Sequence, residues 1–346
     1  MVQNTKKTNF SQIVRFKTTG YDSQIDYIKG ICILFVIWTH CMDRKELGII
    51  LFPYWGDTAV PLFLIIQVFH YYKKGIDLRM PDTIKLWKRI IRPFIIMVAL
   101  MFISQFFIYY DITEGAFSPS LYWDKRGPGS YYIFVYLELA FIIPLLSPLF
   151  KKHSNKCLFV IFIILSQIIE FITSISHCPD FIYRILFIRY IFLVYIGYLL
   201  ATKGMFINKL SICAIIISIV FIYIFNYTNI NLEPVFYTSI CNWRICHWVC
   251  YIYIAYFFIW LLKQTYEKIY RFTMIRTFIE DLGKYSFEIF LFQIFYYATI
   301  NIYVNKLLSL FTNYSVHHSL YITLSTIICI MPVVLYKKYF FNRKNN

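Results

Sequence analysis

Charged residues are scarce in this sequence, and so is glycine. Asp, Glu, Lys and Arg make up 15% of the 346 residues, whereas about a quarter is usual in a soluble domain. This composition excludes an ordinary soluble protein. The sequence also has no internal repeat and no glycine-rich phosphate loop, so neither a solenoid nor a P-loop nucleotide hydrolase is expected.

Paired cysteines and a leader segment are missing as well. The nine cysteines are scattered, mostly inside apolar runs, without the even pattern of a disulfide framework. The densest group, CNWRICHWVC at residues 241–250, lacks the second ligand pair of a zinc site, so no metal is expected. The polar first 24 residues contain no short apolar segment with a small-residue cleavage site, so no removable signal peptide is expected.

Apolar residues are abundant, at 59% of the chain. Ten apolar runs are long enough to cross ~30 Å of hydrocarbon as helices that rise ~1.5 Å per residue. The sequence therefore predicts an all-α fold, a polytopic membrane helical bundle of about ten transmembrane helices. The expected spans are residues 25–42, 48–72, 90–110, 131–150, 156–174, 181–201, 209–227, 244–262, 284–304 and 319–336.

The chain carries 34 Lys and Arg against 18 Asp and Glu. In a soluble protein this excess would suggest nucleic acid, but here most basic residues fall in alternate loops between the spans. Because such loops lie on the cytoplasmic side, both termini are expected in the cytoplasm, with the lipid bilayer and no nucleic acid as partner. The predicted organisation is a tail at 1–24, a transmembrane domain at 25–341 and a tail at 342–346.

The first expected span reads IDYIKGICILFVIWTHC and contains two ionisable residues at its ends. Lys29 and His40 are 11 residues apart, which places them on one helix face, ~16 Å apart along the axis. Asp26, one turn before Lys29, can pair with it. The alternative is that Lys29 snorkels to the headgroups and His40 only marks the membrane interface.

Charges in other spans are costly unless they face the bundle interior or water. Arg89 and Arg92 share one face at the cytoplasmic start of the third span, where guanidinium groups can bind phosphate oxygens or anionic lipid headgroups. Glu138 lies in the fourth span, and Arg184 and Arg189 lie in the sixth. The two arginines either line a cavity or pair with Glu138 and Glu170 and hold spans together.

Four stretches resemble, in the same order, motifs of the acyltransferase-3 family of membrane proteins. They are IDYIKGICILFVIWTH, AVPLFLIIQVF, the Arg-x-x-Arg segment WKRIIRPFI and LGKYSFEIFLFQ. Four positions depart from the family pattern: Lys29 replaces the usual arginine, Gln67 and Val68 replace a Ser-Gly pair, and Gln293 replaces a histidine. The resemblance covers nearly the whole chain and includes the ten-span layout.

This resemblance implies an enzyme that transfers an acyl group to a hydroxyl of a cell-surface glycan or of its lipid-linked precursor. It implies acyl-CoA, commonly acetyl-CoA, as donor substrate, with no permanently bound cofactor. The expected location is the bacterial plasma membrane. Neither the acceptor sugar, the acyl group nor the oligomeric state can be read from the residues.

The chemistry of acyl transfer suggests roles for individual residues. His40 is expected to remove the proton of the acceptor hydroxyl or to carry the acyl group covalently, with Glu138 as the carboxylate that orients it. Lys29, Arg89 and Arg92 are expected to bind the donor. Other cavity candidates are Asp26, Arg184, Arg189, Glu288 and Gln293.

An exporter of a glycan or lipid-linked precursor is the alternative function. Transporters, however, tend to have repeated halves and helices broken at glycine or proline near mid-membrane. With 11 glycines in 346 residues and no repeat, this chain shows neither feature. A non-enzymatic membrane scaffold would leave the combination of Lys29, His40, Arg89 and Arg92 unexplained.

Overall fold

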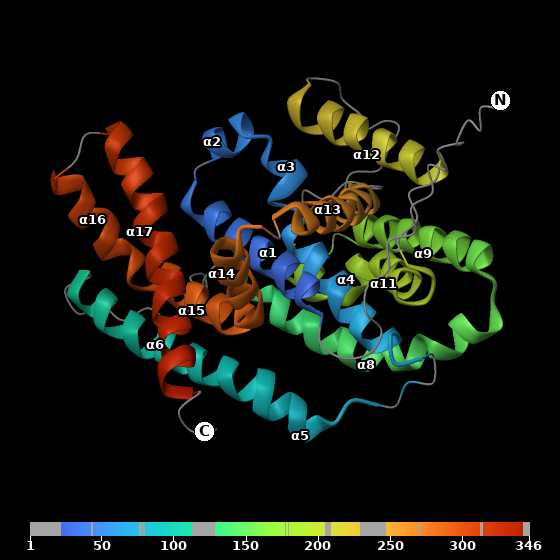
Figure 1. Cartoon of the computed structure of the whole chain (residues 1–346), viewed down its shortest axis with the longest axis horizontal. Helices are drawn as coiled ribbons and strands as arrows, with labels where there is room; N and C mark the ends of the chain where they lie inside the picture. Colours follow the sequence, from blue (N-terminus) through green and yellow to red (C-terminus); the bar gives the residue numbers. More distant parts are fainter. Residues whose placement is uncertain are drawn as a thin grey trace, which may run out of the picture. The chain divides into compact units, whose positions relative to one another are not determined.

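The computed structural model of this protein is built from helices (Figure 1). It describes the chain except residues 1–21, 43, 76–77, 79, 113–128, 177, 179, 205–208, 229–246, 270, 312–313 and 342–346. The described part contains no strand, so the predicted all-α class is confirmed. Nearly all of the two expected tails, and Cys241 and Cys246 of the cysteine group, lie outside the described residues.

Several helices are suited to cross a membrane. Five in the described part are long and apolar enough, and a bent pair of helices supplies a sixth if it counts as one span. They are Phe52–Tyr72, Thr83–Ile108, Tyr131–Lys152, Asn155–Thr173, His317–Tyr339 and the pair Ser286–Ala298 with Asn301–Leu310. All six overlap expected spans, so a multi-pass membrane protein is confirmed. The count of ten and the cytoplasmic termini stay predictions.

The other four expected spans are also largely helical. Three of them coincide with single helices: α1 (Ser23–Cys41), α12 (Lys209–Tyr227) and α13 (His247–Ile269). The fourth, 181–201, was expected as one helix but is interrupted. It consists of α10 (Asp180–Ile185), η2 (Phe187–Tyr190) and α11 (Ile191–Lys203), with extended backbone at Leu186.

The chain divides into two compact units. The first unit contains Pro61–Leu78 and Ile143–Thr265, and in it α11 packs against α9 (Asn155–Ile175). A Cβ on Gly197 of α11 would lie 2.5 Å from Cβ of Val68, in α4 (Ala59–Tyr72). Because glycine has no side chain, α11 and α4 approach closely at this point.

The second unit contains Ser23–Val60, Arg79–Ile142 and Tyr266–Asn346. Its centre is α1, which packs against α14 (Thr273–Lys284), α15 (Ser286–Ala298) and α17 (Tyr314–Leu335). Figure 1 shows α14 beside α1. The short helices α2 (Arg44–Ile49) and α3 (Phe52–Trp55) follow α1, and η3 (Tyr336–Phe341) continues α17.

Two glycines allow α1 and α14 to touch through their backbones. A Cβ on Gly30 of α1 would lie 2.1 Å from the carbonyl oxygen of Ile279, and a Cβ on Gly283 of α14 would lie 1.6 Å from that of Asp26. Real Cβ atoms essentially never come within 3.0 Å of another heavy atom. The spacing of these two helices therefore requires glycine at both positions.

Hydroxyl and carboxylate groups fix the start of α1. Tyr266 Oη lies 2.8 Å from Ser23 Oγ and donates a hydrogen bond to Glu280 Oε1 at 3.0 Å. Arg276 pairs with Glu280 one turn away on α14, at 3.4 Å. Burial, with the neighbouring Glu280 carboxylate acting in the same direction, raises the pKa of the Tyr266 hydroxyl, so it stays protonated and can donate.

The expected span 284–304 is not one straight helix. It is split into α15 and α16 (Asn301–Phe311), which bend by 60° at Thr299 and Ile300. The bend leaves carbonyls at the end of α15 without helical partners. Gln105 of α6 (Arg92–Ile112) donates a hydrogen bond from Nε2 to the Ala298 carbonyl at 3.3 Å, which stabilises the break.

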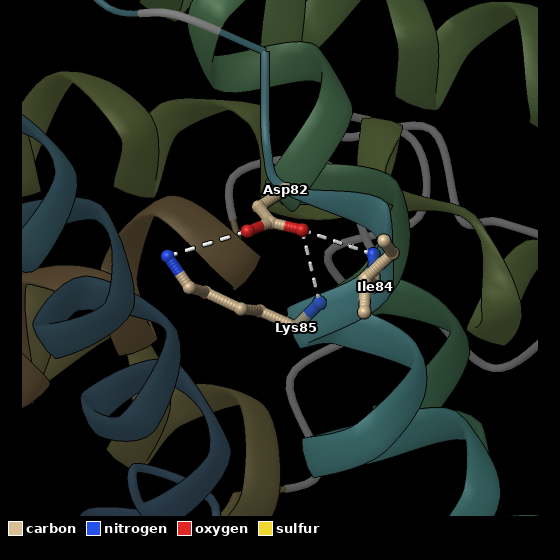
Figure 2. Close-up of polar contacts among 3 residues, drawn as sticks. All are labelled: Asp82, Ile84 and Lys85. Atoms are coloured by element: carbon tan, nitrogen blue, oxygen red, sulfur yellow. Dashed lines mark hydrogen bonds and ion pairs between the residues drawn. The ribbon is translucent and has the colours of Figure 1, made fainter.

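The third expected span begins earlier than residue 90. Asp82 caps α5 (Thr83–Leu86) by accepting hydrogen bonds from the backbone of Ile84 and Lys85 at 3.0 and 3.1 Å (Figure 2). A π-helical turn, η1 (Trp87–Ile91), then leads into α6. Pro93 lacks an N–H and its ring would clash with the carbonyl of Arg89 in a regular α-helix, and the wider turn relieves that clash.

Candidate active site

α1 positions the two ionisable residues that the sequence singles out. It is helical without interruption from Ser23 to Cys41, so Lys29 and His40 lie on one continuous helix as expected. The ion pair expected between Lys29 and Asp26 is present. Asp26 is buried and Lys29 is half-buried, so the pair presents a neutralised cation rather than an isolated charge.

The His40 imidazole is half-buried at the last turn of α1 and lies against α15. Its ring meets the ring of Tyr297 edge to face, with 5.7 Å between centroids. The Gly129 backbone comes close on another side, since a Cβ there would lie 4.0 Å from Nε2 of His40. His40 therefore faces protein groups of the second unit.

Tyr297 is itself fixed by two polar contacts. Its hydroxyl donates to the carbonyl of Ile37 at 3.1 Å and lies 2.8 Å from Sγ of Cys41. A tyrosine hydroxyl has one hydrogen, so the Cys41 thiol is the donor in the second contact. These bonds join α15 to the last turn of α1 and hold the aromatic ring beside the imidazole.

A series of aromatic side chains runs from the His40 region to Arg89. Phe290 of α15 lies beside Gly129, 3.3 Å from the position of its Cβ. The Phe290 ring meets Tyr132 of α8 (Tyr131–Lys152) at 5.2 Å, and Tyr132 lies 6.1 Å from Tyr136, one turn along the helix. The Tyr136 hydroxyl interacts electrostatically with Arg89. The aromatic rings thus extend from the His40 region along α8 toward the Arg89 end.

The basic cluster at the start of α6 differs in detail from the expectation. Arg89 and Arg92 are both exposed, but Arg89 lies in the π-helical turn. Residues three apart are ~60° apart around an α-helix, and the wider turn spreads them further, so the two side chains diverge more than expected. That they share one face stays a prediction. Lys85 pairs with Asp82 at 3.2 Å (Figure 2), which leaves the two arginines as the stronger anion attractors.

Glu138 lies in α8, as expected, and is half-buried. It is two residues beyond Tyr136, which is ~200° around the helix axis and therefore off the face that carries Tyr132 and Tyr136. The described contacts of His40 are with Tyr297 and the neighbourhood of Gly129. The orienting role of Glu138 stays a prediction.

The two candidates on α15 have different surroundings. Glu288 forms an ion pair with Lys337 of η3 at 2.7 Å, with both side chains partly exposed. Gln293 is completely buried, and neither its Oε1 nor its Nε2 has a hydrogen-bond partner in the described structure. Glu288 thus ties α15 to the end of α17, whereas Gln293 has no structural bond of this kind.

The arginines of the sixth expected span belong to the first unit. Arg184 lies in α10. Arg189 in η2 is 2% exposed, and its guanidinium lies 5.6 Å from the Tyr183 ring and 5.0 Å from the Tyr190 ring. Stacking on aromatic rings stabilises a guanidinium away from water. The aromatic neighbours stabilise the buried guanidinium, and a role for Arg189 in binding a ligand stays a prediction.

Sequence reasoning missed the side chains that surround His40. Tyr297, Phe290 and Tyr132 are three among many aromatic residues, which make up 21% of the chain, so nothing distinguished them. Gly129 could have been recognised, because glycines are few and this one directly precedes the fourth span. Its φ of +84° is a conformation that side chains disfavour.

A comparison with protein-family models matches residues 22–336 to the acyltransferase-3 model, which is described as an acyltransferase domain. The matched region contains all the candidate site residues of both units. No curated protein and no solved structure matches the chain.

Proposed function

This chain belongs to the acyltransferase-3 family, and from that premise we propose that it transfers an acyl group, most simply acetyl, from acyl-CoA to a glycan hydroxyl. The acceptor is a cell-surface glycan or its lipid-linked precursor, and the protein lies in the bacterial plasma membrane. An acyltransferase with several membrane-crossing helices is suited to such a reaction, since its acceptor is built or carried at the membrane.

His40 is the proposed base. The acceptor O–H bond breaks, its proton passes to a ring nitrogen of His40, and the oxygen bonds to the thioester carbonyl carbon. The C–S bond then breaks, and the leaving thiolate takes the proton from the imidazolium. The products are an O-ester and coenzyme A. In the covalent alternative the imidazole nitrogen attacks first, and the acceptor hydroxyl then takes the acyl group from it.

Arg89 and Arg92 are the proposed binding groups for the phosphates of coenzyme A. Exposed guanidinium groups form bidentate bonds with phosphate oxygens. The series of aromatic side chains from Tyr136 through Tyr132 and Phe290 to the His40 region, with Arg89 close enough to Tyr136 to act on it electrostatically, supports this proposal most. The long pantetheine arm, which separates the phosphates from the thioester, would follow that series. Lys29 would bind the donor only after its ion pair with Asp26 opens.

The proposal is tested with purified protein and acetyl-CoA, by measuring release of the coenzyme A thiol. His40→Ala should reduce release ~10²–10⁴-fold, the usual contribution of a general base. The matched control is His153→Ala, which removes a histidine in the connection between α8 and α9 and should leave release unchanged. Equal release by the wild type and His40→Ala would refute the role of His40.

Two further measurements separate the alternatives. Mass spectrometry of the intact protein after a rapid quench at neutral pH should show an added acyl mass that His40→Ala lacks if His40 carries the acyl group, and no added mass if it acts as a base. Translocation of a lipid-linked glycan without consumption of thioester, in both the wild type and His40→Ala, would instead favour the exporter.

A further inference from the structure

Gln293 is a buried amide without a structural partner. Its exposed fraction is 0%, and both side-chain polar atoms are without a hydrogen bond among the residues that the structure describes. An unsatisfied buried donor or acceptor typically costs ~1–3 kcal/mol. Gln105 of α6 is equally buried, but its Nε2 donates a hydrogen bond to Ala298 at the end of α15. Gln105 has a structural role that Gln293 lacks.

The helix register places Gln293 on the face of α15 that meets the His40 region. Tyr297, which contacts His40, is four residues further along, and Phe290, which lies beside Gly129, is three residues earlier. At ~100° per residue these are ~40° and ~60° away around the axis, and ~6 and ~4.5 Å along it. Gln293 therefore lies between Phe290 and Tyr297 along the axis of α15, and on the edge of the face that these two residues share.

The chemistry of the amide restricts its ligand. Nε2 can only donate and the Oε1 can only accept, so a ligand that satisfies both must supply an acceptor and a donor. A thioester carbonyl supplies an acceptor alone and would leave Oε1 unsatisfied. Hydroxyl groups do both, and two hydroxyls on adjacent carbons can bond the two amide atoms at once.

We propose that Gln293 binds the acceptor through neighbouring hydroxyl groups and thereby selects polyols as substrates. Nε2 donates to the oxygen of one hydroxyl, and Oε1 accepts from the next. The first oxygen can still pass its own proton to His40. This inference rests on the proposed function and adds a residue that recognises the acceptor, not the donor.

The experiment compares glycerol, which has vicinal hydroxyls, with 1-propanol, which has one. Acetyl transfer from acetyl-CoA to each alcohol is measured, together with the coenzyme A released to water alone, on protein purified without glycerol. The wild type should prefer glycerol about tenfold in kcat/KM, the effect of one to two neutral hydrogen bonds. Gln293→Met should abolish that preference, so that transfer to glycerol falls more than release to water does.

Thermal unfolding provides a second measurement. A glutamine with a structural role should lower the unfolding temperature when it is replaced, whereas Gln293 should not. Gln293→Met should unfold at the same temperature as the wild type or higher, because it removes two unsatisfied polar atoms from the interior. The matched variant Gln105→Met should unfold at a lower temperature, because it loses the bond to Ala298, and it should keep the glycerol preference.

Three results would overturn the inference. They are a glycerol preference that survives Gln293→Met, a wild type that does not distinguish the two alcohols, and an equal loss of release to water and of transfer to glycerol in Gln293→Met. The last result would place the amide at the thioester. A wild type that releases no coenzyme A under any condition would refute the proposed function itself, which distinguishes the two failures.

Discussion

The glycine contact between α1 and α14 gives the sharpest prediction about the integrity of the second unit. Gly30→Ala adds a methyl group 2.1 Å from the carbonyl oxygen of Ile279, and Gly283→Ala adds one 1.6 Å from that of Asp26. The obstructing atoms belong to the backbone, so no rotamer change can relieve either clash. The two helices have to move apart instead.

The size of the effect follows from the geometry. Restoring a contact of 3.0 Å requires a shift of roughly 1 Å at Gly30 and somewhat more at Gly283. Overpacking of this kind costs ~1–3 kcal/mol, while replacing a helical glycine with alanine returns up to ~1 kcal/mol of helix propensity. We expect a net loss of ~1–2 kcal/mol for Gly30→Ala and a larger loss for Gly283→Ala.

The double variant should be less destabilised than the sum of the two single variants. Both methyl groups press the same two helices apart, so the separation caused by one relieves part of the clash of the other. The matched control is Gly48→Ala in α2, since a Cβ on Gly48 has no atom within 4 Å. Alanine there should be neutral or slightly stabilising.

Unfolding can be followed with a thiol-reactive fluorophore on detergent-solubilised protein. Cys32 is fully buried in α1, two residues from Gly30, so it reacts only when α1 leaves its packing. The melting temperature should fall by several degrees in Gly30→Ala and Gly283→Ala but not in Gly48→Ala. Equal melting of all three variants would refute the contact as the structure places it.

Four further predictions concern the site and its supports. Tyr297→Phe keeps the ring beside the imidazole but loses the bond to Ile37, so it should lower stability by ~1 kcal/mol in thermal unfolding while most coenzyme A release remains. Gly129→Ala places a side chain at φ +84° and 3.3 Å from Phe290, so release should fall severalfold. Arg89→Ala should raise the KM for acetyl-CoA severalfold, and added salt should shrink the difference. The backbone N–H of Lys85 lowers the pKa of Asp82, so its cap supports α5 at neutral pH and is lost below about pH 4, which hydrogen exchange of the first α5 amides should report.

The positions of the helices follow largely from the sequence. In a bilayer every backbone N–H and C=O must be paired within the protein, so long apolar runs form helices, and the expected spans 25–42, 131–150 and 209–227 match helices closely. The ion pair of Lys29 and Asp26 was also predictable, because residues three apart on a helix are neighbours. These features depend on local spacing alone.

The interruptions of helices within the expected spans could be predicted only in part from the sequence. Pro93 marked the disturbed turn at Arg89, but the bend between α15 and α16 has no glycine or proline at Thr299 and Ile300. Gln105, almost two hundred residues earlier in the chain, supplies a donor to the freed carbonyl and stabilises that bend. A partner so distant in sequence leaves no local signal.

The sequence by itself determined an all-α membrane acyltransferase, the helix that carries Lys29 and His40, and the basic start of α6. Only the tertiary structure decided which residues meet the imidazole, among them Tyr297 and the backbone of Gly129. The physical reason is that apolar periodicity specifies a helix but not its neighbours. In a chain so rich in aromatic side chains, packing alone selects the few that line the site.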